Sequence, residues 1–198
     1  MGLLKESDMA VFHALEEHCL ALFDSDKTKD VTAIAVSMMQ REDVPIHFPF
    51  HHFIVPAALM TAAAVSRGDS RETLASYLDR IRERAETVPG GVCGNFGVCG
   101  ASVGTGIFMS VMTDSTPLSG KTWRWNQEVT AAALTAIAAL DGPRCCKRST
   151  FLALKAAVPL VNDRLGLDLV FTQPVCAFYP LNKTCKKQAC PFFPEVTA

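Results

Sequence analysis

Seven cysteines in predicted loops or at predicted helix ends are the residues of this chain best suited to chemistry. They are Cys93, Cys99, Cys145, Cys146, Cys176, Cys185 and Cys190. The eighth, Cys19, lies on the apolar face of a predicted helix and is expected to be a small core residue. Thiolates bind soft metals such as zinc, copper(I) and the iron of iron–sulfur clusters. The sequence therefore predicts a metal centre held by loop cysteines.

The cysteine spacings favour a cluster over a simple zinc site. Cys93 and Cys99 are spaced C-x5-C, Cys145 and Cys146 are adjacent, and the last three follow C-x8-C-x4-C. Structural zinc sites usually contain C-x2-4-C pairs, and none of these spacings contains C-x2-C. We therefore expect a [4Fe–4S] cluster, with zinc as the alternative metal. Metal-free thiol chemistry stays open, because Cys145–Cys146 or Cys93/Cys99 could be a redox pair.

The residues around the cysteines are suited to holding an inorganic centre. The stretch GGVCGNFGVCGASVGTG is rich in glycine, and Gly94, Gly97 and Gly100 would let the backbone wrap closely around a bound cofactor. Cys145 and Cys146 have Arg144, Lys147 and Arg148 as sequence neighbours and precede a predicted helix. Positive charge and a helix start both favour the thiolate. Lys183, Lys186 and Lys187 would do the same for Cys185 and Cys190.

Histidines supply a second kind of chemistry. The segment IHFPFHHFIVP contains His47, His51 and His52. Histidine titrates near neutral pH and acts as a general acid or base or as a metal ligand. If the segment is helical from Pro49, His47 and His51 can converge while His52 points elsewhere. We expect a proton-transfer role for this group, against packing or capping roles, and expect Arg144 or Lys147 to hold a charged substrate.

The elements that must position these residues are predicted to be helices. Capping residues and apolar periodicity predict helices from Asp8 to about Phe23, from Val31, from Pro56 to Arg67, from Arg71, from Ala101 to Met112, from Thr122 to Leu140 (the longest), and after a Ser149 cap. Residues 169–171 are the only plausible strand. The fold class is therefore mostly α, a compact bundle of about seven helices over residues 1–172, with a Cys-rich tail over 173–198 that packs on it.

Composition excludes several classes of protein. The net charge of −1 gives no nucleic-acid-binding face. No window approaches eighteen uninterrupted apolar residues, and the N-terminus lacks the features of a signal peptide. We expect a cytoplasmic protein that binds neither membrane nor nucleic acid. Thiols stay reduced in the cytoplasm, so ligands or reactive groups are expected rather than disulfides.

Three segments together resemble a Cys- and Gly-rich family of unknown function from anaerobic bacteria and methanogenic archaea. They are HFPFHHFIVPAAL, GGVCGNFGVCGASVGTGIF, and GPRCCKRSTFLAL followed by NKTCKKQACPFFP, covering about residues 44–193. The family's histidine motif runs His-Gly-Pro-Glu-His-His, and here Phe48 and Phe50 replace the Gly and the Glu. The resemblance implies an anaerobic, intracellular setting, and fusion of some members to methyltransferase-like domains.

These observations predict a [4Fe–4S] enzyme of the lyase or sulfur-transfer type, acting on an unidentified small molecule. Three cysteines would hold the cluster and leave one iron open as a Lewis acid or sulfur carrier. The ligands would be the three tail cysteines, or a set drawn from all seven. The alternatives are a non-catalytic metal-binding or electron-transfer accessory of a methyltransferase-like or redox partner, and a metal-free thiol redox protein.

Overall fold

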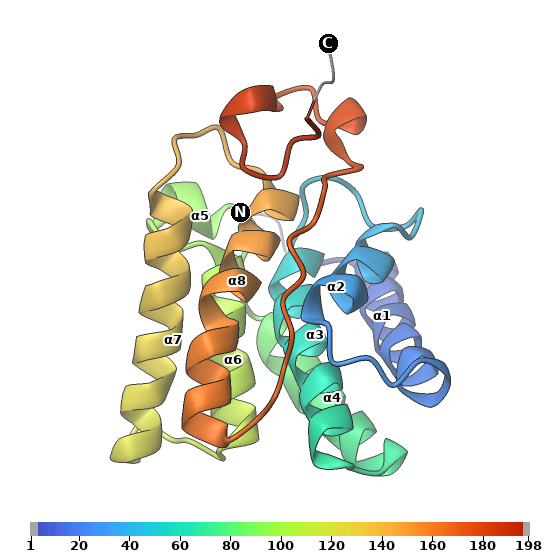
Figure 1. Ribbon diagram of the computed structural model, residues 1–198, viewed down its shortest axis with the longest axis vertical. Coiled ribbons are helices and arrows are strands. Elements are labelled where there is room, and N and C mark those ends of the chain that lie inside the picture. The colour runs from blue at the N-terminus through green and yellow to red at the C-terminus, as the bar shows by residue number, and fades with distance from the viewer. Residues whose placement is uncertain (1–3, 196–198) are drawn as a thin grey trace.

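The computed structural model describes residues 4–195 and confirms the mostly α class (Figure 1). Eight α-helices occur in that range, rather than about seven, because a short helix forms inside the glycine-rich stretch. They are α1 (Glu6–Ser25), α2 (Val31–Met39), α3 (Phe50–Arg67), α4 (Arg71–Ala85), α5 (Val92–Asn95), α6 (Gly100–Met112), α7 (Lys121–Ala138) and α8 (Cys146–Leu165). Two 3-10 helices, η1 (Tyr179–Leu181) and η2 (Lys187–Ala189), lie in the tail. Residues 1–3 and 196–198, which the predicted helical domain and tail include, lie outside the described range.

Several predicted helix boundaries were wrong, and two of them matter for the site. Pro56 does not begin α3 but lies inside it, so His51 and His52 are helical residues. Ser149 does not cap α8; Cys145 is the N-cap residue and Cys146 the first helical residue. Local capping preferences suggested the later starts, whereas the helices begin where their first turns can pack.

Smaller boundary errors leave the architecture unchanged. Helix α1 begins at Glu6, and Asp8 accepts a hydrogen bond from the Lys5 backbone N–H at 2.8 Å. The longest helices are α1 and α8, with 20 residues each, rather than α7 with 18. Within residues 4–195 the segment around Val170 forms no strand, only an isolated parallel bridge to Asp30.

Helix α3 is the centre of the core. Every residue from Phe50 to Ala64 is buried. A helix that is apolar all round must be covered on all sides, and α1, α2, α4, α6 and α8 pack against it. Phe12 of α1 packs edge-on against both Phe50 and Phe53, with ring centroids 5.1 and 5.9 Å apart. The buried first turn of α3 therefore fixes the position of its two histidines.

Helices α3 and α6 approach closely because α6 has glycine where they meet. A Cβ at Gly104 would lie 2.8 Å from Pro56 Cδ and 3.0 Å from the His52 carbonyl oxygen. A Cβ at Gly100 would lie 2.1 Å from the His52 ring. Gly100 and Gly104 are therefore the positions at which α6 meets α3. This contact brings the start of α6 against the start of α3.

The starts of α3, α6 and α8 lie at the same end of the molecule, beneath the tail (Figure 1). After α8 the chain runs back as an extended segment along the helices and then folds over this end. The site residues on these three helices, on α5 and in the tail are therefore gathered at one end. Of the helices within residues 4–195, none has a stretch long and apolar enough for a membrane crossing.

The close contact between α3 and α6 predicts that adding one methyl group to α6 at Gly104 lowers the stability of the protein. Alanine is ordinarily favoured over glycine in a helix by up to about 1 kcal/mol. Gly104→Ala should instead lower the free energy of unfolding by about 1–3 kcal/mol, because the methyl group overpacks against Pro56. Gly94→Ala, where nothing lies within 4 Å of the added Cβ, is the matched control. Urea unfolding measures both, and a G104A protein more stable than wild type would contradict the close contact.

Candidate functional site

The seven loop and helix-end cysteines divide into two groups. Cys93, Cys99 and Cys146 line one large cavity and are called the cavity trio. Cys145, Cys176, Cys185 and Cys190 line a second, narrow pocket under the tail and are called the tail quartet. Cys19 is fully buried in the core, as expected. The adjacent residues Cys145 and Cys146 therefore belong to different sites.

The large cavity has the size of a small-molecule site. Its volume is about 780 Å³, within the range of pockets that bind small ligands. The cavity trio lies there with all three predicted histidines, His47, His51 and His52, and with Arg144. The start of α1, including Lys5 and Asp8, and the end of α7 supply other parts of its wall. The convergence of His52 on the same cavity is a departure from the prediction that it would point elsewhere.

Three helix N-termini meet at this cavity. Cys99 is the N-cap residue of α6, Cys146 is the first residue of α8, and His51 and His52 lie in the first turn of α3. Unpaired backbone N–H groups and the aligned peptide dipoles give each helix start a partial positive charge. The cavity is therefore suited to negative charge, whether on thiolates, on a cluster or on a substrate.

The two buried histidines are held as neutral rings with one free nitrogen. His51 Nδ1 donates to the Phe48 carbonyl oxygen at 2.9 Å, and His52 Nδ1 donates to the Val88 carbonyl oxygen at 3.2 Å. Each Nε2 then carries a lone pair, and that of His51 is buried without a hydrogen-bond partner. Burial lowers the pKa of His51 to about 3 and that of His52 to about 4. Both rings are uncharged at neutral pH, and each Nε2 can accept a hydrogen bond or bind a metal.

His47 is more accessible and lies in the positive field of Arg144. Burial lowers its pKa, and the Arg144 guanidinium lowers it further. Its Nδ1 is also buried without a hydrogen-bond partner. His47 is thus the histidine of the group best placed to exchange protons with a substrate in the cavity.

Burial outweighs the neighbouring positive charges at the cysteines, contrary to the expectation from sequence. The pKa of Cys146 is raised to about 12 by burial, although Arg144 lowers it, and the Cys99 thiol adds to the rise. Burial likewise raises the pKa of Cys145 and Cys176. These three thiols are protonated at neutral pH in the metal-free chain, and a metal would have to displace their protons.

The tail quartet joins two distant parts of the chain. Cys145 lies at the start of α8, and the other three come from the tail that folds over it. The thiols are close enough for their charges to interact, since Cys185 and Cys190 each raise the pKa of both Cys145 and Cys176. The free space between them is only about 20 Å³, room for a single water-sized object.

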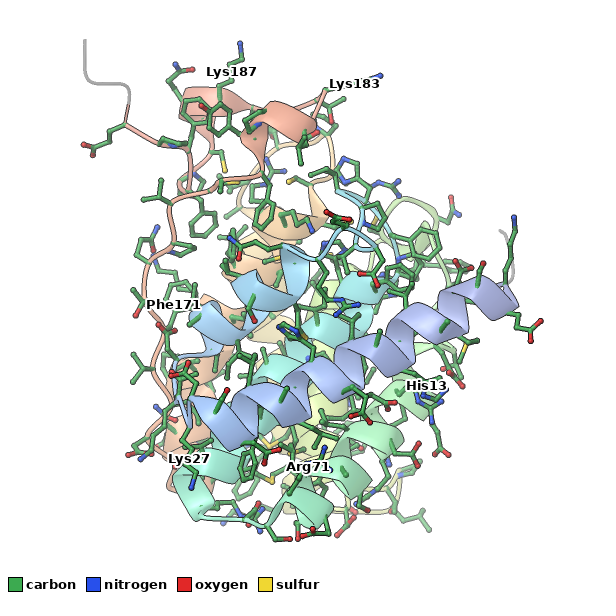
Figure 2. All side chains as sticks on the ribbon, turned by 90° about the vertical axis from the view of Figure 1, so that its right-hand side faces the viewer. His13, Lys27, Arg71, Phe171, Lys183 and Lys187 are labelled. Atoms are coloured by element: carbon green, nitrogen blue, oxygen red, sulfur yellow. The ribbon has the colours of Figure 1, made fainter. Side chains whose placement is uncertain are left out.

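The predicted basic residues take different positions. Arg144 is exposed at the cavity, whereas Lys147 is only 1% exposed and lines the tail pocket instead. Lys147 Nζ donates to the Met39 carbonyl oxygen at 3.0 Å, and burial lowers its pKa to about 8. Lys183 and Lys187 project from the tail away from the helices (Figure 2). A substrate-binding role in the cavity is thus open to Arg144 but not to Lys147.

The predicted glycines also divide. Gly97 and Gly100 line the cavity, and Gly97 has a φ of 70°, which favours glycine. Gly94 is exposed and is not part of the cavity lining. A side chain at position 100 would overlap the His52 ring, so Gly100 is also needed for the packing of α6 against α3.

Two residues outside the predicted set belong to the site. Arg148 is buried, lines both the cavity and the tail pocket, and donates to the carbonyl oxygens of Asp141 and Pro143. Asn182 donates from Nδ2 to Cys145 Sγ at 3.5 Å. The sequence could have indicated Arg148, because it lies two residues after the adjacent cysteines Cys145 and Cys146. No local signal marked Asn182, because its partner is 37 residues away.

All eight cysteines are free thiols. In the part of the chain that the structure describes, no three or more His, Cys, Asp or Glu side chains form a group that could hold a metal ion as they stand. Metal binding at either group of cysteines would therefore include movement of side chains within the pocket.

The fold and site define a class of helical protein with two groups of cysteines gathered at one end. The chain belongs to a family of unknown function (DUF5714), which matches residues 16–193. The match covers both groups of cysteines and the three cavity histidines. No curated protein and no solved structure is significantly similar to the chain.

The buried histidines predict a steep loss of stability in acid. Their pKa values in the folded protein lie below the ordinary value, so the unfolded chain binds protons that the folded chain does not. Stability is fully present above about pH 6.5 and falls as the pH drops toward about 4, by up to ~1.4 kcal/mol per pH unit for each histidine. Denaturant unfolding of the metal-free chain between about pH 7 and pH 4.5 measures the slope.

Substitution separates these histidines from other titrating groups. His51→Asn and His52→Asn should each reduce the slope by up to ~1.4 kcal/mol per pH unit, although both cost stability at pH 7. His18 and His47, whose pKa values are also lowered, should keep contributing in both variants. The matched control is His13→Asn, at an exposed position in α1. Equal slopes in all four proteins would contradict the neutral, buried state of the α3 histidines.

Proposed function

We propose that the chain is an iron–sulfur enzyme whose [4Fe–4S] cluster is held in the large cavity by Cys93, Cys99 and Cys146. One observation carries this proposal: three cysteines from two distant segments, three histidines and two arginines all line one cavity of about 780 Å³. Three cysteine ligands leave one iron of the cluster without a protein ligand. When bound, the cluster would supply a Lewis acid or a carrier of sulfur at that iron.

The donor set of the cavity suits a cluster. Thiolates are the usual ligands of iron–sulfur clusters, and the helix starts that carry Cys99 and Cys146 place partial positive charge beside a negatively charged group. The raised pKa values of Cys145 and Cys146 weaken the rival metal-free thiol chemistry at that pair, because the thiolate is the nucleophile. A zinc ion is the alternative metal.

The chain's own residues would position a substrate and move its proton. The exposed Arg144 guanidinium at the cavity would bind an anionic group of a small molecule. His47, the least buried of the three histidines, would give or take the proton. His51 and His52 would accept hydrogen bonds through Nε2, since each Nδ1 is already used by a backbone carbonyl. This arrangement supports a lyase or sulfur-transfer reaction.

The setting follows from the same proposal. A cluster with an exposed iron is sensitive to oxygen, which fits an anaerobic cell and the reducing cytoplasm. The proposed partners are a methyltransferase-like protein, as a fused or separate domain, or a redox protein that keeps the cluster reduced. No nucleic-acid ligand is proposed, given the net charge of −1.

Anaerobic reconstitution with iron and sulfide tests the cluster. Wild-type protein should turn brown and bind acid-labile sulfide and iron in equal amounts. Cys99→Ser and Cys146→Ser should each lose most of the cavity iron, because each removes one of three ligands. Cys19→Ala, at the buried core cysteine, is the matched control and should keep it. A colourless wild-type protein without iron or sulfide would overturn the proposal, and bound zinc in its place would support the alternative metal.

The open iron has its own signature. Mild oxidation removes the iron that lacks a cysteine ligand, so the cavity cluster should convert to a three-iron form detectable by electron paramagnetic resonance. Added cyanide, a strong ligand of exposed iron, should shift the spectrum of the reduced cluster. Arg144→Gln should leave both signals in place, because Arg144 binds substrate rather than iron in this proposal. A cluster inert to both treatments would contradict the open iron.

A further inference from the structure

We propose that the tail quartet is a second metal centre, in which Cys145, Cys176, Cys185 and Cys190 close the coordination of one thiophilic metal site. Its occupant is either a zinc ion or a cluster with four protein ligands, and its role is to fix the tail on the start of α8. The inference goes beyond the proposed enzyme, because it uses none of the cavity trio and holds whether or not the cavity binds a cluster.

Four cysteines that form no disulfide share this pocket. They come from chain segments separated by about thirty residues or more, and all four are free. Cys176 lies within the electrostatic influence of the other three thiols, and Cys145 within that of Cys185 and Cys190. Four thiolates are a complete ligand set for zinc or for a [4Fe–4S] cluster. Among the described residues these thiols do not form a metal-holding group as they stand, so a single ion would draw the four side chains together and a cluster would also push the tail outward.

Two hydrogen-bond donors already point at the sulfurs. The Lys187 backbone N–H donates to Cys185 Sγ at 3.4 Å. The Asn182 side-chain amide donates to Cys145 Sγ at 3.5 Å, although Asn182 is itself buried. N–H groups directed at sulfur stabilise metal-bound thiolates.

An uncompensated buried cation provides an independent observation. Lys147 is 1% exposed and lines the tail pocket, with its Nζ over the Phe178 ring at 4.7 Å. Among residues 4–195 no carboxylate forms an ion pair with Lys147, or with the buried Arg148 beside it. A buried charge is costly unless an opposite charge lies near it. A four-thiolate metal centre carries net negative charge and would balance both cations.

The tail has little regular structure to hold it in place. Over residues 173–195 it contains only the two three-residue 3-10 helices, and one backbone hydrogen bond joins the two ends of this range, from the Cys176 N–H to the Phe192 carbonyl oxygen at 2.7 Å. Phe192 anchors it by packing against Phe151 of α8, with ring centroids 5.1 Å apart. Three cysteine–metal bonds from the tail to the site at Cys145 would supply the missing constraint.

Cobalt titration of the full chain tests the site. Co²⁺ added anaerobically to metal-free wild-type protein should give the intense thiolate-to-cobalt absorption of a four-sulfur site, and Zn²⁺ should displace it. Cys185→Ser and Cys176→Ser should lose most of that absorption. Cys93→Ser, in the cavity trio, is the matched control and should retain it. Equal absorption in wild type and in both tail variants would overturn the proposal.

Trypsin gives a readout of the tail itself. Lys183 and Lys187 are exposed at one end of the molecule, and Lys27 is exposed at the other end (Figure 2). Zn²⁺, or reconstitution with iron and sulfide, should slow cleavage after Lys183 and Lys187 at least tenfold in wild type and not in Cys185→Ser. Cleavage after Lys27 should not change. Tail cleavage at the same rate with and without both metals would overturn the proposal.

Metal analysis separates the two proposed centres. Cys185→Ser should lose the tail metal, zinc or iron, and keep the iron that depends on Cys99 and Cys146. Cys99→Ser should do the reverse. A metal content that falls only in cavity variants would overturn the tail centre and leave the proposed enzyme intact, and the opposite pattern would overturn the enzyme alone.

Discussion

The close contact between α3 and α6 is the constraint on which the site depends. Helix α3 is buried on all sides, so its first turn can neither fray nor turn toward solvent. Gly100 and Gly104 let α6 lie directly against that turn. A side chain at either position would separate the two helix starts, and Cys99 would no longer face the histidines across the cavity. The arrangement of the cavity residues therefore depends on glycine at positions 100 and 104.

The pair Cys145–Cys146 divides the end of the molecule into two compartments. Cys145 is the N-cap residue of α8, with extended backbone, and Cys146 is its first helical residue. The change of backbone conformation between them turns one side chain under the tail and the other into the cavity. Arg148, one turn further on, lines both compartments, so any charge that develops in one is felt in the other.

Burial rather than neighbouring charge controls the ionisable groups at this end. Arg144 lies beside Cys146 and lowers its pKa, yet burial keeps the thiol protonated. At His47 burial is the larger cause and the Arg144 charge acts in the same direction, toward the neutral ring. Such a site binds metal with release of protons, so loading would be favoured as the pH rises.

The sequence by itself determined the helical class, the core role of Cys19 and the list of residues able to do chemistry. These follow from periodicity, composition and residue type, which are local properties. Only the tertiary structure decided that the seven cysteines form a trio and a quartet, that His52 joins His47 and His51, and that Lys147 is withdrawn from the cavity. The helix starts at Phe50 and Cys146 also depended on packing. The reason is physical, because these outcomes depend on which helix ends meet in the folded protein. A contact between segments that are distant in the sequence produces no periodic pattern of residues that could predict it.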